Sequence, residues 1–93
     1  MLTIRRVVGD SMQPTLAHGD IVIAVRKKPK IGNIVIARNE GREVIKRVKR
    51  ITSPTLVYLL GDNAEKSTDS RHYGNVDATS LLGVVIKTYK SKK

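Results

Sequence analysis

Short apolar runs set the limits on how this chain folds. They are rich in β-branched residues, they end at glycine, proline or polar turn residues, and they occupy or lie within residues 2–8, 21–25, 34–37, 42–51, 56–60 and 81–89, of which 42–51 mixes valine and isoleucine with charged residues. Runs this short favour strands over helices, and strands at this spacing are typical of small antiparallel folds. The sequence therefore predicts an all-β fold, a compact and partly open sandwich or barrel of short antiparallel strands.

Turn residues between the runs predict how they connect. Asn39-Glu40-Gly41 separates residues 34–37 from residues 42–51, and this arrangement predicts a hairpin. The run at residues 21–25 is apolar at every position, so we expect a strand that is buried on both faces.

A polar stretch at residues 61–75 interrupts the series of predicted strands. A loop of that length in so small a domain is typically functional or disordered. We expect a helical turn at residues 77–80, with Asp77 as its cap, before the last strand.

The length of 93 residues predicts one domain, residues 1–93, which ends in a basic tail at about residues 87–93. No cysteine is present, and this excludes disulfides and thiolate chemistry. The longest apolar run is far shorter than the ~20 residues of a membrane-spanning helix. We therefore expect a soluble chain without a transmembrane segment or signal peptide.

The formal net charge of +10 favours acidic partners such as nucleic acid, anionic lipid or an acidic polypeptide. The only aromatic residues are three tyrosines, too few for a protein that reads single-stranded nucleic acid by stacking. Nucleic acid is therefore a weak candidate partner, whereas peripheral contact with an anionic membrane stays open. A non-catalytic basic module that binds nucleic acid or anionic membrane is one hypothesis for the function.

Ser11 lies in a short turn between two apolar runs, and Pro14 constrains the backbone that follows it. A serine in such a turn is a candidate nucleophile, but a hydroxyl needs a neighbouring base to be effective at neutral pH.

Lys46 is the best candidate for that base. In a strand at residues 42–51 it shares one face with Val44 and Val48. Apolar surroundings lower the pKa of a lysine because they penalise the charged form. The alternative is that the amine of Lys46 reaches past the valines into water.

A serine–histidine arrangement is the rival catalytic hypothesis, with His72 as the base and Asp69 or Asp62 as the acid that orients it. His72 lies among turn residues, however, and His18 beside Gly19 is also expected to be a turn residue. The histidines and carboxylates have no recognisable metal-ligand spacing, so no metal or cofactor is predicted.

Several segments together resemble the Ser/Lys-dyad peptidases of the signal peptidase I and LexA-like group. Residues 11–16 followed by Gly19-Asp20 resemble the nucleophile box, and residues 45–48 resemble the lysine box. Gly61-Asp62-Asn63, Ser67, Asp69-Ser70-Arg71 and Gly74 are similar to the signature downstream of the lysine, and residues 82–85 resemble the strand after it. The resemblance covers nearly the whole chain and implies the signal peptidase catalytic fold.

The resemblance also implies roles for individual residues. Ser11 would attack the scissile carbonyl, Lys46 would be the general base, and Ser67 would orient the lysine amine. The ion pairs of Asp62 with Arg47 and of Asp69 with Arg71 would fix the long loop against the lysine strand as structural support. Met12 and Pro14, beside the nucleophile, are expected to contact the polypeptide substrate.

The resemblance implies a serine endopeptidase that removes a leader or signal peptide. Gly9 stands where many bacterial signal peptidases carry a serine of the oxyanion hole, and we expect neither their membrane anchor nor the large insertion between the lysine strand and Gly61. The short form is most similar to the nickel-type superoxide dismutase maturation proteases. Such a protease would be cytoplasmic, whereas a truncated signal peptidase would be membrane-associated. A LexA-like self-cleaving regulator is a further alternative, and the sequence sets no oligomeric state.

Overall fold

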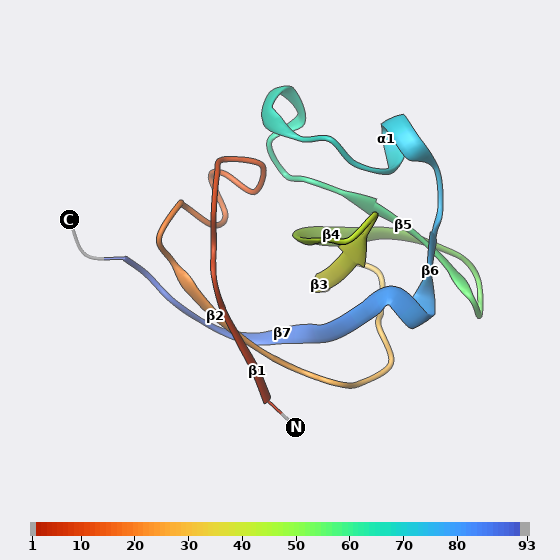
Figure 1. Cartoon of the computed structure of the whole chain (residues 1–93), viewed down its shortest axis with the longest axis horizontal. Coiled ribbons are helices and arrows are strands. Elements are labelled where there is room, and N and C mark those ends of the chain that lie inside the picture. Colours follow the sequence, from red (N-terminus) through yellow and green to blue (C-terminus); the bar gives the residue numbers. More distant parts are fainter. Residues whose placement is uncertain (1, 92–93) are drawn as a thin grey trace.

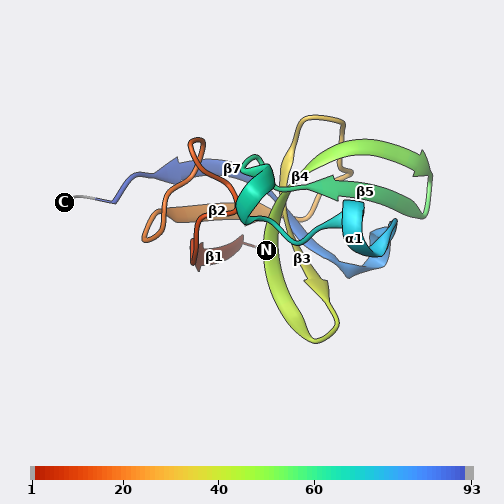
Figure 2. The ribbon, with the colours of Figure 1, turned by 90° about the horizontal axis from the view of Figure 1, so that it is seen from above.

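A single antiparallel sheet of seven strands forms the body of the protein in the computed structural model, which describes residues 2–91 (Figures 1 and 2). The strand order is β1-β2-β7-β3-β4-β5-β6. The strands are β1 (Leu2–Arg6), β2 (Ile21–Val25), β3 (Ile34–Asn39), β4 (Arg42–Ser53), β5 (Leu56–Leu60), β6 (Val76–Asp77) and β7 (Leu81–Tyr89). The predicted all-β antiparallel fold is confirmed.

The predicted hairpin is formed by β3 and β4, which pair in register from Ile34 opposite Arg47 to Asn39 opposite Arg42. Glu40 and Gly41 connect the two strands with φ angles of 51° and 78°. A two-residue turn with both φ angles positive matches the twist of the flanking strands, so this connection keeps the hairpin in register.

Both faces of the sheet carry a hydrophobic cluster. The first cluster consists of the buried residues Val35, Ala37, Val48, Val57, Leu59, Val76 and Val84. The second consists of Val7, Met12, Leu16, Val22, Ala24 and Ile36. Strand β3 supplies both clusters because successive side chains point to opposite faces.

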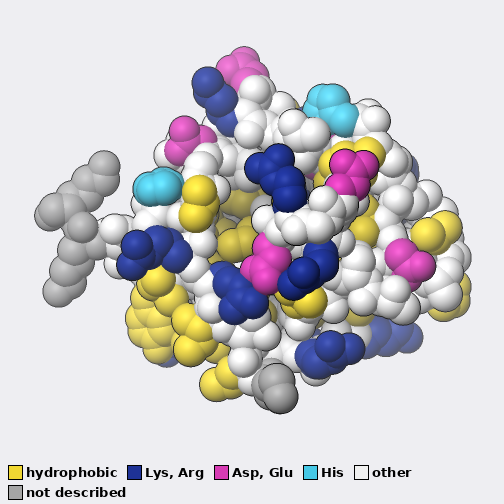
Figure 3. Space-filling view, viewed as in Figure 1, with side chains coloured by type: hydrophobic (Ala, Val, Ile, Leu, Met, Phe, Trp, Pro, Cys, Tyr) yellow, Lys and Arg dark blue, Asp and Glu magenta, His cyan; other side chains and the backbone are white. Residues whose placement is uncertain are grey.

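Strand β2 is buried on one face only, so the prediction of two buried faces is wrong. Val22 and Ala24 are fully buried in the second cluster, whereas Ile21, Ile23 and Val25 are only half-buried. The physical reason is that the outer face of β1, β2 and β7 lies toward solvent. Hydrophobic side chains are visible on the surface between the two chain ends (Figure 3).

The polar stretch at residues 61–75 is more regular than a plain loop. It contains a short 3-10 helix, η1 (Ala64–Lys66), and one turn of α-helix, α1 (Ser70–Tyr73). The predicted helical turn is also present as η2 (Ala78–Ser80), and the Asp77 carboxylate accepts a hydrogen bond from the Thr79 N–H. The longest helix within residues 2–91 has four residues, so no described helix could cross a bilayer.

Candidate active site

The Ser11 turn is tied down at both ends by buried side chains and backbone hydrogen bonds. Met12 and Leu16 are buried in the second cluster, and the Leu16 N–H donates to the Met12 carbonyl over 2.9 Å. The Gly19 N–H donates to the Val7 carbonyl over 2.8 Å, so the chain returns beside the point where it left β1. The turn therefore holds Ser11 in a fixed place at the end of β1.

Ser11 and Lys46 line the same groove, which has a volume of about 320 Å³. One wall is the end of β1 with the residues that follow it, and the other is the first half of β4. The lining residues are Arg5, Arg6, Val7, Val8, Ser11, Met12, Arg42, Glu43, Val44, Ile45 and Lys46.

Lys46 is buried, and only 4% of its surface is exposed. It pairs with Val35 in the β3–β4 register, on the face where Val44 and Val48 contribute to the first cluster. Burial lowers the pKa of the Lys46 amine; the carboxylate of Asp69 opposes this shift and the guanidinium of Arg71 adds to it. The alternative in which the amine reaches water is therefore wrong.

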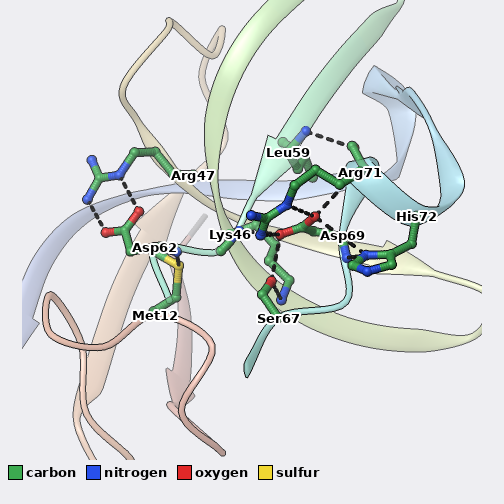
Figure 4. Close-up of polar contacts among 11 residues, drawn as sticks. Met12, Lys46, Arg47, Leu59, Asp62, Ser67, Asp69, Arg71 and His72 are labelled. Atoms are coloured by element: carbon green, nitrogen blue, oxygen red, sulfur yellow. Dashed lines mark hydrogen bonds and ion pairs between the residues drawn. The ribbon is translucent and has the colours of Figure 1, made fainter. Parts of the chain in front are cut away.

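The Lys46 amine donates a hydrogen bond to the Ser67 hydroxyl over 3.0 Å, and that hydroxyl donates to the Asp69 carboxylate over 2.7 Å (Figure 4). Ser67 therefore offers its oxygen to the amine while its proton is directed at Asp69. This arrangement fixes both the position of the lysine amine and the direction of its remaining bonds.

Asp69 is fully buried and accepts hydrogen bonds from several directions. The Gly61 N–H donates over 2.8 Å. The Nη2 group of Arg71 donates over 2.6 Å (Figure 4). These donors and that of Ser67 hold the pKa of the Asp69 carboxyl well below its usual range, although burial alone would raise it. The carboxylate is thus charged, satisfied and rigid.

Asp62 joins the nucleophile turn to the lysine strand. Its carboxylate accepts two hydrogen bonds of 2.8 Å from the Arg47 guanidinium and a further one from the Thr15 hydroxyl. The Asn63 N–H donates to the Ser11 carbonyl over 2.8 Å. Both ion pairs implied by the resemblance, Asp62 with Arg47 and Asp69 with Arg71, are thus present. Through Asn63, the loop after β5 also contacts the backbone of Ser11 directly.

Gly61 is a site residue that the sequence analysis did not single out. A Cβ atom at this position would lie 2.2 Å from the Ser67 hydroxyl oxygen and 2.7 Å from the Ser11 carbonyl oxygen. Both distances are too short for a real contact, so only glycine fits between the nucleophile turn and Ser67. Its place directly after a strand, in the Gly61-Asp62-Asn63 motif, was the signal available in the sequence.

The histidines are engaged away from the nucleophile. His72 accepts a hydrogen bond at Nδ1 from the Asp69 N–H over 3.2 Å, as part of the cap of α1. His18 accepts one at Nδ1 from the Gly9 N–H over 2.9 Å. No polar contact in the described part of the chain joins either ring to Ser11, so the structure does not assemble the serine–histidine arrangement.

The two expected substrate-contacting residues occupy different places. Met12 lines the groove, and its sulfur accepts a hydrogen bond from the Asp62 N–H over 3.4 Å. Pro14 is exposed and lines a separate shallow hollow with residues 62–65.

The Ser11 hydroxyl makes no hydrogen bond to any other residue in the range 2–91, and neither does the Ser11 N–H. Catalytic hydrogen bonds often form only when substrate is bound, so an open serine beside a buried amine is consistent with a nucleophile and its base. The unused N–H is available to an oxyanion. The Gly9 N–H is not, because it donates to His18.

The amino-acid sequence matches a known protein family and a relative. The family model described as Peptidase S24-like matches residues 2–86. The chain is also similar to mitochondrial inner membrane protease subunit 1 of Mus musculus, with 31% identity over 102 residues. That match covers 81% of this chain and 61% of the mouse protein, so the chain spans about three fifths of the relative's length.

Proposed function

Because the chain belongs to the Peptidase S24-like family, we propose that it is a serine endopeptidase in which Ser11 is the nucleophile and Lys46 is the general base. One observation carries this proposal. The Lys46 amine is buried, its pKa is lowered, it is hydrogen-bonded to Ser67, and it lines the same groove as Ser11. A lysine in this state is neutral, and so able to act as a base, at lower pH than a surface lysine.

In the proposed mechanism the Ser11 oxygen attacks the scissile carbonyl carbon while Lys46 accepts the serine proton. The Ser11 N–H stabilises the oxyanion of the tetrahedral intermediate. The C–N bond then breaks, and the Lys46 ammonium gives its proton to the departing amine. In the second half of the reaction, Lys46 removes a proton from water, and the hydroxide adds to the carbonyl carbon of the Ser11 ester. The bond between that carbon and the Ser11 oxygen then breaks, and the Lys46 ammonium returns its proton to the Ser11 oxygen as the new carboxylic acid is released.

Two unpaired strand edges support an extended peptide as the substrate. Among the described strands, β1 pairs only with β2, and β4 pairs with β5 only from Arg47 onward. One edge of β1 and one edge of residues 42–46 are therefore unpaired, and both segments line the groove. A peptide strand bound there gains main-chain hydrogen bonds that do not depend on its sequence.

Removal of an N-terminal leader is the specific reaction that we propose. The resemblance to the nickel-type superoxide dismutase maturation proteases suggests the leader of such a dismutase as the first candidate substrate. Cleavage there would expose a new N-terminus for metal binding on the substrate. Nothing in this reaction requires a cofactor on the peptidase.

Peripheral contact with an anionic membrane belongs to the same proposal. Leu2, Ile4 and Tyr89 are at least half exposed on β1 and β7, and Arg6 and Lys87 lie on the same strands. Apolar side chains with basic neighbours suit the surface of an anionic bilayer. Co-sedimentation with anionic vesicles but not with neutral vesicles is expected, and equal binding to both would contradict this part.

The test of the proposed function is a single cut in a precursor protein. The chain is mixed with a dismutase precursor that carries its leader, and the products are identified by mass spectrometry. We expect one new N-terminus with the wild-type chain and none with Ser11→Ala or Lys46→Ala. Lys28→Ala, in an exposed loop, is the control that should cut normally. Full activity of Lys46→Ala would overturn the dyad.

A further inference from the structure

An ion pair bridges the two walls of the groove. The Arg5 guanidinium, on β1, donates two hydrogen bonds to the Glu43 carboxylate, on β4, and the Nη2–Oε2 bond measures 3.0 Å. Both residues line the groove, and no backbone pairing joins their strands in the described structure. The walls are therefore held together here by side chains alone.

The register explains why Arg5 points toward the groove. Arg5 lies opposite Val22, which is fully buried, so the two side chains share the inner face of the sheet. On β4, Glu43 shares a face with Ile45, which packs against the same cluster as Val22. The ion pair thus lies on the inner face of the sheet, beside the second hydrophobic cluster.

Positive charge exceeds negative charge around this ion pair. Arg38 also lies near Glu43, with its Nη2 atom 3.5 Å from the carboxylate. Arg6 and Arg42 line the groove as well, and neither takes part in an ion pair within residues 2–91. Two guanidinium groups therefore contact the Glu43 carboxylate, and two more line the same groove, which leaves positive charge to attract a second carboxylate.

We propose that Arg5 determines specificity by favouring substrates with Asp or Glu three to five residues before the scissile bond. This rests on the proposed function. A peptide strand beside β1 advances by about 3.3 Å per residue, as β1 itself does. Arg5 is three positions from Val8, the last residue of that wall before the turn to Ser11. An interacting side chain therefore lies several residues from the cut.

The acidic residue belongs on the N-terminal side of the bond. The N-terminal fragment of the substrate stays esterified to Ser11 until water releases it, whereas the C-terminal fragment leaves as an amine. A groove that holds the peptide through both steps must therefore bind the N-terminal fragment. The Arg5–Glu43 pair is partly exposed, so a substrate carboxylate can share or replace Glu43 as the partner of Arg5 at small cost.

The experiment compares peptides that carry Asp, Asn or Lys at one of these three positions and are otherwise identical. With the wild-type chain we expect kcat/KM to be about 5-fold higher for Asp than for Asn, which is the range of a partly exposed ion pair. Lys should be worse than Asn. The preference should weaken as salt is added, because exposed charges are screened.

Two variants separate a role in specificity from a structural role. Arg5→Gln removes the cation, so the Asp preference should fall to about that of Asn. Glu43→Gln frees the same cation, so the preference should increase. Both variants break the ion pair. If the pair served only to hold the two walls of the groove together, both variants would change the Asp preference in the same direction. Lys28→Gln, which changes the net charge as Arg5→Gln does but lies outside the groove, should leave the preference unchanged.

The outcomes distinguish the two proposals. Equal cleavage of the Asp, Asn and Lys peptides, or a change in the same direction in both variants, would overturn the role of Arg5 and leave the peptidase intact. If none of the peptides is cut at Ser11-dependent rates, the proposed function itself fails, and the specificity proposal with it.

Discussion

The Lys46 amine donates a 3.0 Å hydrogen bond to the Ser67 hydroxyl, although the two residues are 21 positions apart in the sequence. An amine that is almost fully buried gains little from water, so this bond decides where its lone pair points after deprotonation. The Ser67 proton is directed at Asp69, which leaves the Ser67 oxygen free to accept from the amine. The pair couples the strand that carries the base to the loop that follows β5.

The first prediction concerns Ser67→Ala. Without the hydroxyl, the amine loses its fixed partner, and we expect kcat to fall about 10- to 100-fold, because loss of positioning weakens proton transfer. KM should change little, since Ser67 does not line the groove. Steady-state kinetics on the leader peptide measure both quantities. Ser53→Ala, at the half-buried C-terminal end of β4 and outside the groove, is the control. A rise in KM at constant kcat would point to substrate binding instead.

The second prediction concerns pH. Burial lowers the folded-state pKa of Lys46 from its ordinary value of 10.5, so the neutral base is present at lower pH than for a free lysine. We expect kcat/KM to rise with pH on an acid limb whose midpoint lies clearly below 10.5, because only the neutral amine accepts the serine proton. A pH–rate profile measures it. An acid limb near 10.5 would show that Lys46 titrates as an ordinary lysine.

The same shift sets the sign of a stability change. The unfolded chain keeps a proton at Lys46 up to its ordinary pKa of 10.5, whereas the folded chain releases it at lower pH. Between the two pKa values, the unfolded state binds more protons, so the contribution of Lys46 to the free energy of unfolding increases with pH. Lys46→Met removes the titrating group, so the difference in the free energy of unfolding between wild type and variant should change with pH in this direction. Denaturant unfolding of both proteins at several pH values measures it, and the groups that they share, such as Tyr73, cancel in the difference.

The strands and the lysine face were predictable because they depend on local patterns. Short β-branched runs and turn residues predict β3 and β4, and alternation places Lys46 among Val44 and Val48. Burial of β2 was misjudged because a fully apolar run does not reveal whether a second layer covers its outer face. The partial exposure of Ile21, Ile23 and Val25 shows that none of the described elements covers that face fully.

Contacts between segments that are far apart in the sequence could not be predicted from local sequence patterns. Arg47 and Asp62 are 15 positions apart, and no local pattern indicates that their side chains meet; only the resemblance suggested it. The place of Gly61 between Ser67 and the Ser11 carbonyl needs coordinates, because it depends on three segments that approach within a few ångströms. The opposing charges of Arg5 and Glu43 likewise meet only because β1 and β4 form the two walls of one groove.

The third prediction concerns Asp69→Asn. The carboxylate is fully buried and accepts hydrogen bonds from Gly61, Ser67 and Arg71, and an amide cannot accept all of them while placing its own N–H₂ group. We expect a loss of about 3–5 kcal/mol, the range for breaking a buried charge network. Urea unfolding measures it. Asp77→Asn, at the exposed cap of η2, is the control and should cost about 1 kcal/mol or less.

The pH dependence of this contribution has a definite sign. The folded-state pKa of Asp69 is depressed below 3.8, so its stabilisation is fully present above that value and is lost as the pH falls through the folded-state pKa. The stability difference between wild type and Asp69→Asn should therefore shrink in acid. A difference that stays constant down to pH 2 would assign the effect to packing instead of charge.

The last prediction concerns Gly61→Ala. The new methyl group would lie 2.2 Å from the Ser67 oxygen and 2.7 Å from the Ser11 carbonyl, so Ser67 or the nucleophile turn must move. We expect kcat to fall at least as far as in Ser67→Ala, together with a loss of stability of about 1–3 kcal/mol from overpacking. Gly41→Ala is the matched control, because the hairpin turn has a positive φ and open space around the glycine. It should lose a similar stability through backbone strain alone while kcat stays at the wild-type value. If both variants lose activity in proportion to their loss of stability, the missing side chain at Gly61 matters for stability only and not for the position of Ser67.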